Sequence, residues 1–210
     1  MKQPNPSQKR GRRRVALVST TDVKTYLGIS SSGDDALIGD LISAAQSIIE
    51  DYTHRVFDAS STATKKFDAR SDVSGRSLYF GEGLEAAAIT SVTNGDGTSL
   101  TADTDYIYLP RNAAPYYGLT MLSSSSNYWQ SDSSGNNENA ISIVANWGYS
   151  TSAPNSIVMA AKRLSAFLYR QRDTSSDVDR PLIVDGVTIL PSSIPSDVRR
   201  MLDPFVMNTL

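Results

Sequence analysis

Apolar residues repeat at helical spacing across residues 34–53, and this pattern constrains the fold more than any other feature of the sequence. Leucine, isoleucine, alanine and tyrosine side chains recur there at steps of one, three and four, with polar residues between them. Asp34 and Asp35 stand at the start, where acidic side chains stabilise a helix by capping and by interaction with its dipole. The pattern therefore predicts a long amphipathic helix over residues 34–53.

A second stripe of the same kind follows Pro154 and predicts an amphipathic helix over residues 154–171. Shorter helices are indicated at two other places. A Ser/Thr/Asp cluster before Val23 and a glycine at position 28 predict one over residues 21–27. Apolar spacing at Val198, Met201 and Leu202 predicts the other, which Pro204 ends or kinks.

Between the two long helices, residues 56–149 have the composition of a β region. Short β-type runs alternate with Gly, Asn, Asp and Ser, and Asn94-Gly-Asp-Gly97 is typical of a hairpin turn. Residues 123–139 are Ser-rich and of low complexity, which predicts a flexible loop. The predicted strands are residues 64–67, 77–80, 88–94, 98–100, 106–109, 119–122 and 140–147.

Together these patterns predict an α+β fold. Its helical core would consist of two long amphipathic helices plus short helices, and an antiparallel β region would be inserted between them. The predicted divisions are a disordered basic N-terminal arm (1–18), a helical core (19–55 and 150–203), the inserted β region (56–149, with its Ser-rich loop 123–139) and a C-terminal tail (204–210).

The charge of the chain is divided unevenly along its length. The net charge of −2 combines 20 Lys and Arg with 22 Asp and Glu. Six of the basic residues lie in residues 1–14, which contain no acid, so the remaining 14 basic residues stand against all 22 acidic ones. The arm could bind nucleic acid phosphates, bind an acidic partner surface, or remain solvated. Its candidate contact residues are Lys9, Arg10, Arg12, Arg13 and Arg14.

The composition argues against several classes of function. The chain has no Cys and a single His, His54, which argues against disulfide frameworks, thiolate zinc sites and multi-histidine metal sites. Nucleophile motifs are lacking, so we expect no enzyme, no metal and no cofactor. The apolar stretch 15–18 is too short for a signal peptide core, and no run reaches the length of a membrane span.

Three motifs have ordinary structural readings. Residues 81–86 match G-x-G-x-x-A, but no crossover helix fits after them, so a turn is favoured over a dinucleotide site. Residues 94–105 lack the closing glutamate of a calcium loop, which favours a hairpin. His54 is expected to be structural or exposed at a helix end, because no nucleophile or orienting acid is indicated beside it.

Two apolar groups leave alternatives open. Residues 205–210 could close the core or insert into a neighbouring molecule. The second group could form an exposed aromatic platform, as in a β-rich carbohydrate-binding module on a helical base, or could simply pack the loops. Its members are Tyr116, Tyr117, Tyr128 and Trp129.

Over residues 19–206 the chain resembles the head–tail connector (adaptor, or head-completion) proteins of tailed bacteriophages. Each motif is short, and the resemblance rests on their order and spacing. In chain order they are TTDVKTYLG from Thr20, DDALI from Asp34, YTHRVF from Tyr52, ITSV from Ile89, NGDG from Asn94, DY from Asp105, ISIV from Ile141, WGY from Trp147, Pro154 opening a helix that ends in LYR from Leu168, and LDPF from Leu202.

The resemblance implies a structural virion protein, assembled in the host cytoplasm and located in the neck. Members form a ring, typically of twelve copies, beneath the portal, where they extend the DNA channel and offer a surface to the next neck or tail protein. Another neck or tail structural protein is the alternative. Non-specific contact with packaged DNA would fall to the basic arm. The resemblance implies that the C-terminal segment reaches the portal, with candidate residues Pro195, Val198, Met201, Leu202, Phe205, Val206 and Leu210.

Overall fold

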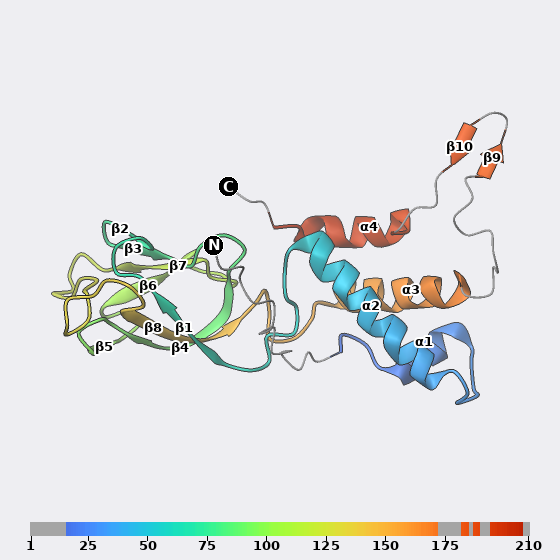
Figure 1. Ribbon diagram of the computed structural model, residues 1–210, viewed down its shortest axis with the longest axis horizontal. Helices are drawn as coiled ribbons and strands as arrows, with labels where there is room; N and C mark the ends of the chain where they lie inside the picture. Colours follow the sequence, from blue (N-terminus) through green and yellow to red (C-terminus); the bar gives the residue numbers. More distant parts are fainter. Residues whose placement is uncertain (1–15, 172–181, 185–186, 190–193, 208–210) are drawn as a thin grey trace, which may run out of the picture.

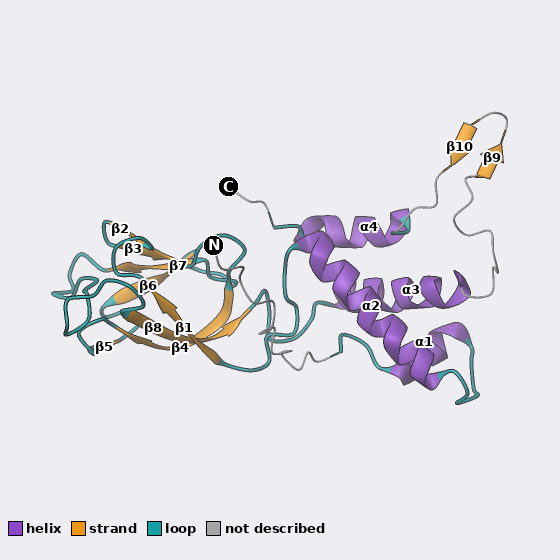
Figure 2. Cartoon of the chain, in the orientation of Figure 1, coloured by secondary structure: helices purple, strands orange, loops and turns teal. Residues whose placement is uncertain are grey.

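The computed structural model describes residues 16–171, 182–184, 187–189 and 194–207. Figure 1 shows two parts arranged along the longest axis of the molecule. The four labelled helices lie in one part, and strands β1 to β8 lie in the other. Figure 2 shows the same division by secondary structure, with loops joining the two parts.

Capping residues mark the ends of the first two helices in the helical part. Ser19 and Asp22 form a capping box at the start of the first helix, and Gly28, with φ 73°, ends it in the left-handed conformation. His54, with φ 55°, ends the second helix and is exposed. The helices are α1 (Thr20–Leu27), α2 (Asp35–Thr53), α3 (Asn155–Gln171) and α4 (Ser196–Leu202), followed by the 3₁₀ helix η1 (Asp203–Phe205).

The β part consists of two four-stranded antiparallel sheets, with strand orders β1-β8-β4-β5 and β2-β3-β7-β6. In β8, buried and partly exposed side chains alternate along all seven residues, as expected where one face of a strand covers a core. The strands are β1 (Ala63–Phe67), β2 (Val73–Ser74), β3 (Ser77–Tyr79), β4 (Ala86–Thr93), β5 (Ser99–Leu100), β6 (Tyr106–Leu109), β7 (Gly118–Met121) and β8 (Ile141–Trp147).

A separate antiparallel pair, β9 (Leu182–Val184) and β10 (Val187–Ile189), lies between α3 and α4 in the chain. It projects from the helical end of the molecule in Figure 1. No strand was predicted here, and the predicted helical core (150–203) included this stretch. The strands are only three residues each, which is shorter than the window in which a period of two can be recognised.

The prediction of a single helical core with an inserted β region is wrong. The fold is mixed α+β, but its core is not dominated by two long helices, because the β part has a core of its own. The helical cluster is mainly aliphatic and includes Ile49 and Leu164. The second cluster includes the rings of Phe67, Phe80 and Trp147, whose centroids lie 5.2–5.8 Å apart. Most of the strands were predicted, but the sequence did not show that they form two sheets around a separate core, because that depends on which strands pair.

The Ser-rich loop 123–139 is anchored to the β part, although its composition indicated flexibility. Trp129 is buried and donates from Nε1 to the carbonyl oxygen of Arg76 at 2.9 Å. The side chain of Asn94 donates to the carbonyl oxygen of Tyr128 at 2.9 Å and accepts from the backbone N–H of Gln130 at 3.1 Å. The buried Trp129 ring and the buried Asn94 amide therefore fix this Ser-rich segment to the β part.

Two chain crossings, rather than a helix packed across a sheet, join the described helical and β parts. The first runs from α2 to β1 and the second from β8 to α3. The crossings contact each other: Tyr149 donates its backbone N–H to the carbonyl oxygen of Val56 at 2.7 Å, and Ala59 donates to that of Ser150 at 3.0 Å. We call this region the junction.

Candidate functional site

The C-terminal segment is folded back onto its own chain. Val198 and Leu202 in α4 are 1% and 0% exposed, as members of the helical core. After α4, the Phe205 ring lies 5.9 Å from that of Phe57 and 5.6 Å from that of Tyr149, measured between centroids. Met207 donates its backbone N–H to the carbonyl oxygen of Thr53 at 2.9 Å. The segment therefore closes the helical core at the junction.

The remaining candidate portal-contact residues divide into two groups. Pro195, Met201, Phe205 and Val206 are partly exposed, so they retain surface for a partner. Leu210 lies outside the described residues. The candidate contact residues of the basic arm also lie outside them; these are Lys9, Arg10, Arg12, Arg13 and Arg14.

A cleft of about 790 Å³ opens at the junction, between the two parts of the molecule. We call it the junction cleft. The stacked rings of Tyr79 and Tyr117 stand on its β side, with centroids 6.5 Å apart. Tyr149 and Val206 line its helical side. The complete lining is Arg55, Tyr79, Gly81, Glu82, Gly83, Leu84, Glu85, Pro110, Pro115, Tyr117, Tyr149, Pro204, Val206 and Met207.

An ion pair between Arg55 and Glu85 connects the two sides of this cleft. Arg55 Nη1 donates to Glu85 Oε2 at 2.5 Å, and the guanidinium also lies over the Tyr149 ring. The Glu85 side chain is only 8% exposed. Burial raises the pKa of the Glu85 carboxyl above its ordinary value, while the charge of Arg55 and its hydrogen bond oppose the shift. Arg55 Nε and Glu85 Oε1 are buried without a hydrogen-bond partner.

No sequence pattern indicated this cleft. The turn predicted for residues 81–86 is confirmed by the positive φ angles of Gly81 (87°) and Gly83 (71°). The same turn carries Glu82 and Glu85 to the cleft. One feature of the sequence could have indicated a partner for Glu85. Glu85 lies directly before the apolar strand β4, and a carboxylate beside a buried strand is usually buried only when a basic or hydrogen-bonding side chain pairs with it.

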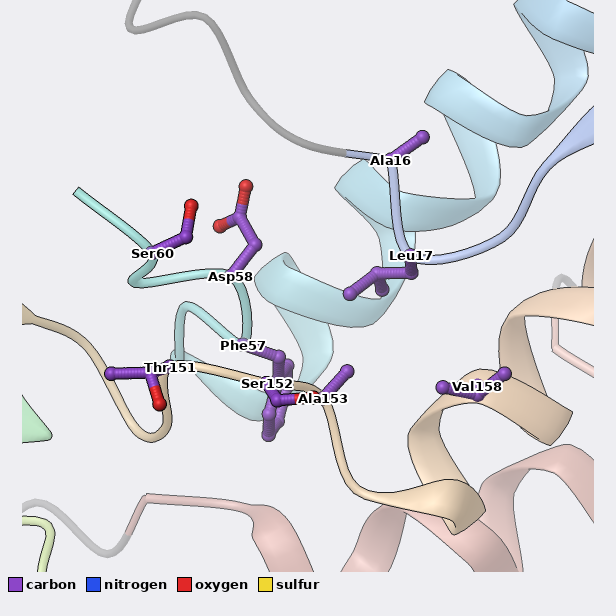
Figure 3. Close-up of a pocket in the computed structure, with 9 residues that line it drawn as sticks. All are labelled: Ala16, Leu17, Phe57, Asp58, Ser60, Thr151, Ser152, Ala153 and Val158. Carbon is purple, nitrogen blue, oxygen red and sulfur yellow. The ribbon is translucent and has the colours of Figure 1, made fainter.

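A smaller pocket of about 220 Å³ lies beside Phe57, at the point where the described chain begins (Figure 3). Ala16 and Leu17 line it on the N-terminal side, where Leu17 points toward Phe57, and Thr151 to Ala153 line it from the second crossing. The Phe57 ring is also 5.4 Å from the Tyr149 ring of the junction cleft. The start of the described chain is therefore separated from that cleft by two neighbouring aromatic side chains.

The helical part also exposes apolar side chains. Tyr26 in α1 is 42% exposed and Met159 in α3 is 43% exposed, and together they line a shallow pocket of about 260 Å³. Lys162 and Asp22, which pair at 3.0 Å, lie in the same pocket. Hydrogen bonds from Ser19, and then the contact with Lys162, lower the pKa of Asp22 to about 2. We call this surface the α1–α3 patch.

The four aromatic residues considered for a glycan platform do not share one environment. Trp129 is buried, and the Tyr116 ring stacks on Tyr108 at 4.5 Å between centroids, against the β core. Tyr117 and Tyr128 are 50% and 65% exposed. The loop-packing alternative therefore describes Trp129 and Tyr116.

Two further properties concern the described part of the chain. Its acidic and histidine side chains form no group of three or more placed to hold a metal ion. None of its helices is long and apolar enough to cross a membrane.

Comparison with protein families identifies the class. A family model described as "Head completion protein" matches residues 16–207, which include both the helical and the β parts. The chain belongs to the head completion protein family. The family resemblance seen in the sequence is therefore confirmed. None of the curated protein sequences matches the chain.

Solved structures with a similar fold come from gene transfer agent (GTA) particles. A chain in the neck of an empty GTA particle, computed with C6 symmetry, has a TM-score of 0.54 and 15% identity over 92% of this chain and 91% of its own length. One in the neck of a native particle, computed with C12 symmetry, has a TM-score of 0.51 and 15% identity over 94% and 95%. A third, from the virion of the native particle, has a TM-score of 0.52 and 16% identity over 92% and 91%.

Proposed function

We propose that this protein is a head–tail connector in the virion neck, forming a ring of twelve copies beneath the portal. The ring would extend the DNA channel and offer the attachment surface for the next neck or tail protein. The observation that carries the proposal is the head completion family match across residues 16–207. The C12 symmetry of the native GTA neck, which contains a chain of similar fold, supports the twelvefold number.

The α1–α3 patch is our candidate for contact between copies in the ring. A closed ring needs a heterologous interface, in which one surface of each copy meets a different surface of the next. Tyr26 and Met159 offer exposed apolar area, and the neighbouring Lys162–Asp22 pair offers polar atoms at the edge. Apolar contact with a polar rim is the usual composition of a stable interface.

The C-terminal segment is our candidate for the portal contact. Because Val198 and Leu202 are buried in the helical core, their contribution would be to hold α4 in place rather than to touch the portal. The contact itself would fall to side chains that keep exposed surface: Pro195, Met201, Phe205 and Val206, together with Leu210.

Charge would serve the DNA channel in two ways. The chain outside residues 1–14 has 14 basic and 22 acidic residues, and acidic groups facing a channel would repel DNA phosphates and allow the duplex to slide. The arm would contact packaged DNA or an acidic protein surface through Lys9, Arg10, Arg12, Arg13 and Arg14.

Negative-stain imaging of the protein alone and mixed with its portal tests the ring. We expect rings in at least the mixture, with added density beneath the portal. Met159→Asp should abolish them, because it places a charge in the proposed interface. Tyr128→Asp, at a more exposed site in the β part, is the matched control and should leave rings unchanged. Portals without added density would refute the proposal.

Deletion of residues 1–14 tests the arm. We expect the truncated protein to fold normally and to bind portal or DNA more weakly at low salt, because the deletion removes six positive charges. Circular dichroism checks the fold, and binding is compared at low and high salt. If portal and DNA binding are both unchanged at low salt, the arm has neither role.

A further inference from the structure

The junction cleft has a base whose hydrogen-bonding groups are not all used. Glu85 is more than nine-tenths buried, and its Oε1 has no hydrogen-bond partner. Arg55 Nε beside it also lacks a partner. Buried polar atoms of this kind cost free energy while they lack partners. A polar group entering the cleft would lower that cost if the Arg55 or Glu85 side chain turned toward it.

The walls of the cleft favour an extended segment that contains proline and basic residues. Tyr79 and Tyr117 are 44% and 50% exposed, with their rings nearly parallel at an interplanar angle of 3°. Aromatic grooves of this kind bind proline-rich segments in the polyproline conformation, and their rings also attract Arg guanidinium groups. Glu82 is exposed on the same lining and adds negative charge.

This chain contains a segment with that composition. Residues 1–15 include Pro4 and Pro6, followed by Lys9 and four arginines, with no acidic residue. Fifteen residues reach up to about 50 Å when extended, which is ample for a cleft at the junction. The arm leaves the described structure at Ala16, beside Phe57, and the Phe57 ring contacts the Tyr149 ring of the cleft wall.

We propose that the N-terminal arm binds the junction cleft of its own chain. Pro4 and Pro6 pack on Tyr79 and Tyr117, and the basic residues lie against Glu82 and the Glu85 side of the cleft. The short path from Ala16 favours the arm of the same chain, because a tether of this length gives a local concentration in the millimolar range. Because the cleft is lined by both parts, the bound arm would connect the helical part to the β part across the junction. While the arm fills the cleft, its basic residues are not available to DNA or to another protein, so this state is separate from the contacts proposed above. The proposal does not depend on ring formation.

A fluorescently labelled peptide of residues 1–15 tests the proposal by anisotropy, titrated with protein lacking residues 1–15. We expect binding that weakens as salt is raised. Tyr117→Ala should weaken it about two- to fivefold through loss of ring contacts. Glu82→Gln should weaken it by a similar two- to fivefold factor through loss of one exposed charge. The matched control is Glu138→Gln, which removes an exposed charge outside the cleft and should leave affinity unchanged.

Three results would overturn the proposal. The first is no binding of the peptide to the truncated protein. The second is equal weakening by Glu82→Gln and Glu138→Gln, which would indicate unspecific attraction to an acidic protein. The third concerns the occupant: the full chain should bind the peptide at least about tenfold more weakly than the truncated protein, because its own arm competes at millimolar local concentration. Equal affinity would show that the arm of the same chain does not fill the cleft.

Discussion

Carboxylates have different roles in the helical and β parts. In the helical part they join separate helices: Lys24 in α1 pairs with Asp35 in α2 at 2.7 Å, and Tyr169 in α3 donates to Asp34 at the start of α2 at 2.6 Å. In the β part they shape loops. Asp132 accepts from the backbone N–H groups of Ser134 and Asn136, each at 2.8 Å.

This difference shows how each part is held together. Helices satisfy their own backbone hydrogen bonds, so side chains must fix one helix relative to the next. Loops leave backbone N–H groups without partners, and Asp or Asn side chains supply acceptors. With its own core and its own set of polar contacts, each part has what a separate cooperative unit requires.

The largest effects are expected from a pair of core truncations, one in each part. Ile143 in β8 and Leu164 in α3 are both fully buried. Ile143→Ala and Leu164→Ala should each lower the free energy of unfolding by about 2–5 kcal/mol, because each leaves a cavity in a packed core. Hydrogen exchange, resolved by segment, should report the loss of protection in the β part for the first variant and in the helical part for the second.

Each variant is the control for the other. If Ile143→Ala lowers protection in α2 and α3 as much as in the strands, the molecule unfolds as one unit. That result would contradict the distinction between two parts, whatever the size of the stability change.

A glycine-to-alanine pair should have opposite effects in the two parts. A Cβ at residue 95 would overlap the carbonyl oxygen of Gln130, so Gly95→Ala should destabilise the β part by about 1–3 kcal/mol. Gly39 lies within α2 with open space around it, so Gly39→Ala should stabilise the helical part by about 0.5–1 kcal/mol. Urea unfolding of both variants measures the change. A destabilising Gly39→Ala would mean that α2 tolerates no added side chain there.

These glycines also show what the sequence could predict. The apolar stripes at residues 34–53 and 154–171 each extend over several helical turns, so they placed α2 and α3 within one or two residues. The turn at Asn94 to Gly97 was predictable because its residues accept positive φ. The contact between Gly95 and residues 130–131 depends instead on a loop that returns from a distant part of the chain. No local pattern encodes such a meeting.

The junction cleft could not be predicted from the sequence either, because it also depends on contacts between distant residues. Arg55 and Glu85 are thirty residues apart, and each belongs to a segment whose pattern describes a helix end or a turn. The family resemblance pointed to the C-terminal segment as the portal contact, and the candidates are its apolar residues. Apolar spacing does not separate residues that close the core, such as Leu202, from residues that remain available to a partner. Only packing makes that distinction.

The pH dependence of stability at the junction should follow the raised pKa of Glu85. Because its folded pKa lies above the ordinary value of 4.5, the stability linked to Glu85 is fully present below pH 4.5 and is lost as pH rises through the folded pKa. Glu85→Gln removes that titration. The stability of the variant relative to the natural protein should therefore improve as pH rises above 4.5 in urea unfolding. A flat difference would show that Arg55 fully offsets the burial of Glu85.

The smallest effect, of opposite sign, is expected in the helical part at Asp22. Its pKa of about 2 lies below the ordinary value of 3.8, so the stability it contributes is present above pH 3.8 and is lost as pH falls toward 2. At neutral pH, Asp22→Asn should be less stable than the natural protein, and this difference should disappear as pH falls from 3.8 toward 2. Salt should weaken the effect, because Asp22 is exposed and its charge is screened. If the relative stability of Asp22→Asn also improves as pH rises, as expected for Glu85→Gln, burial rather than hydrogen bonding governs the pKa of both carboxyls.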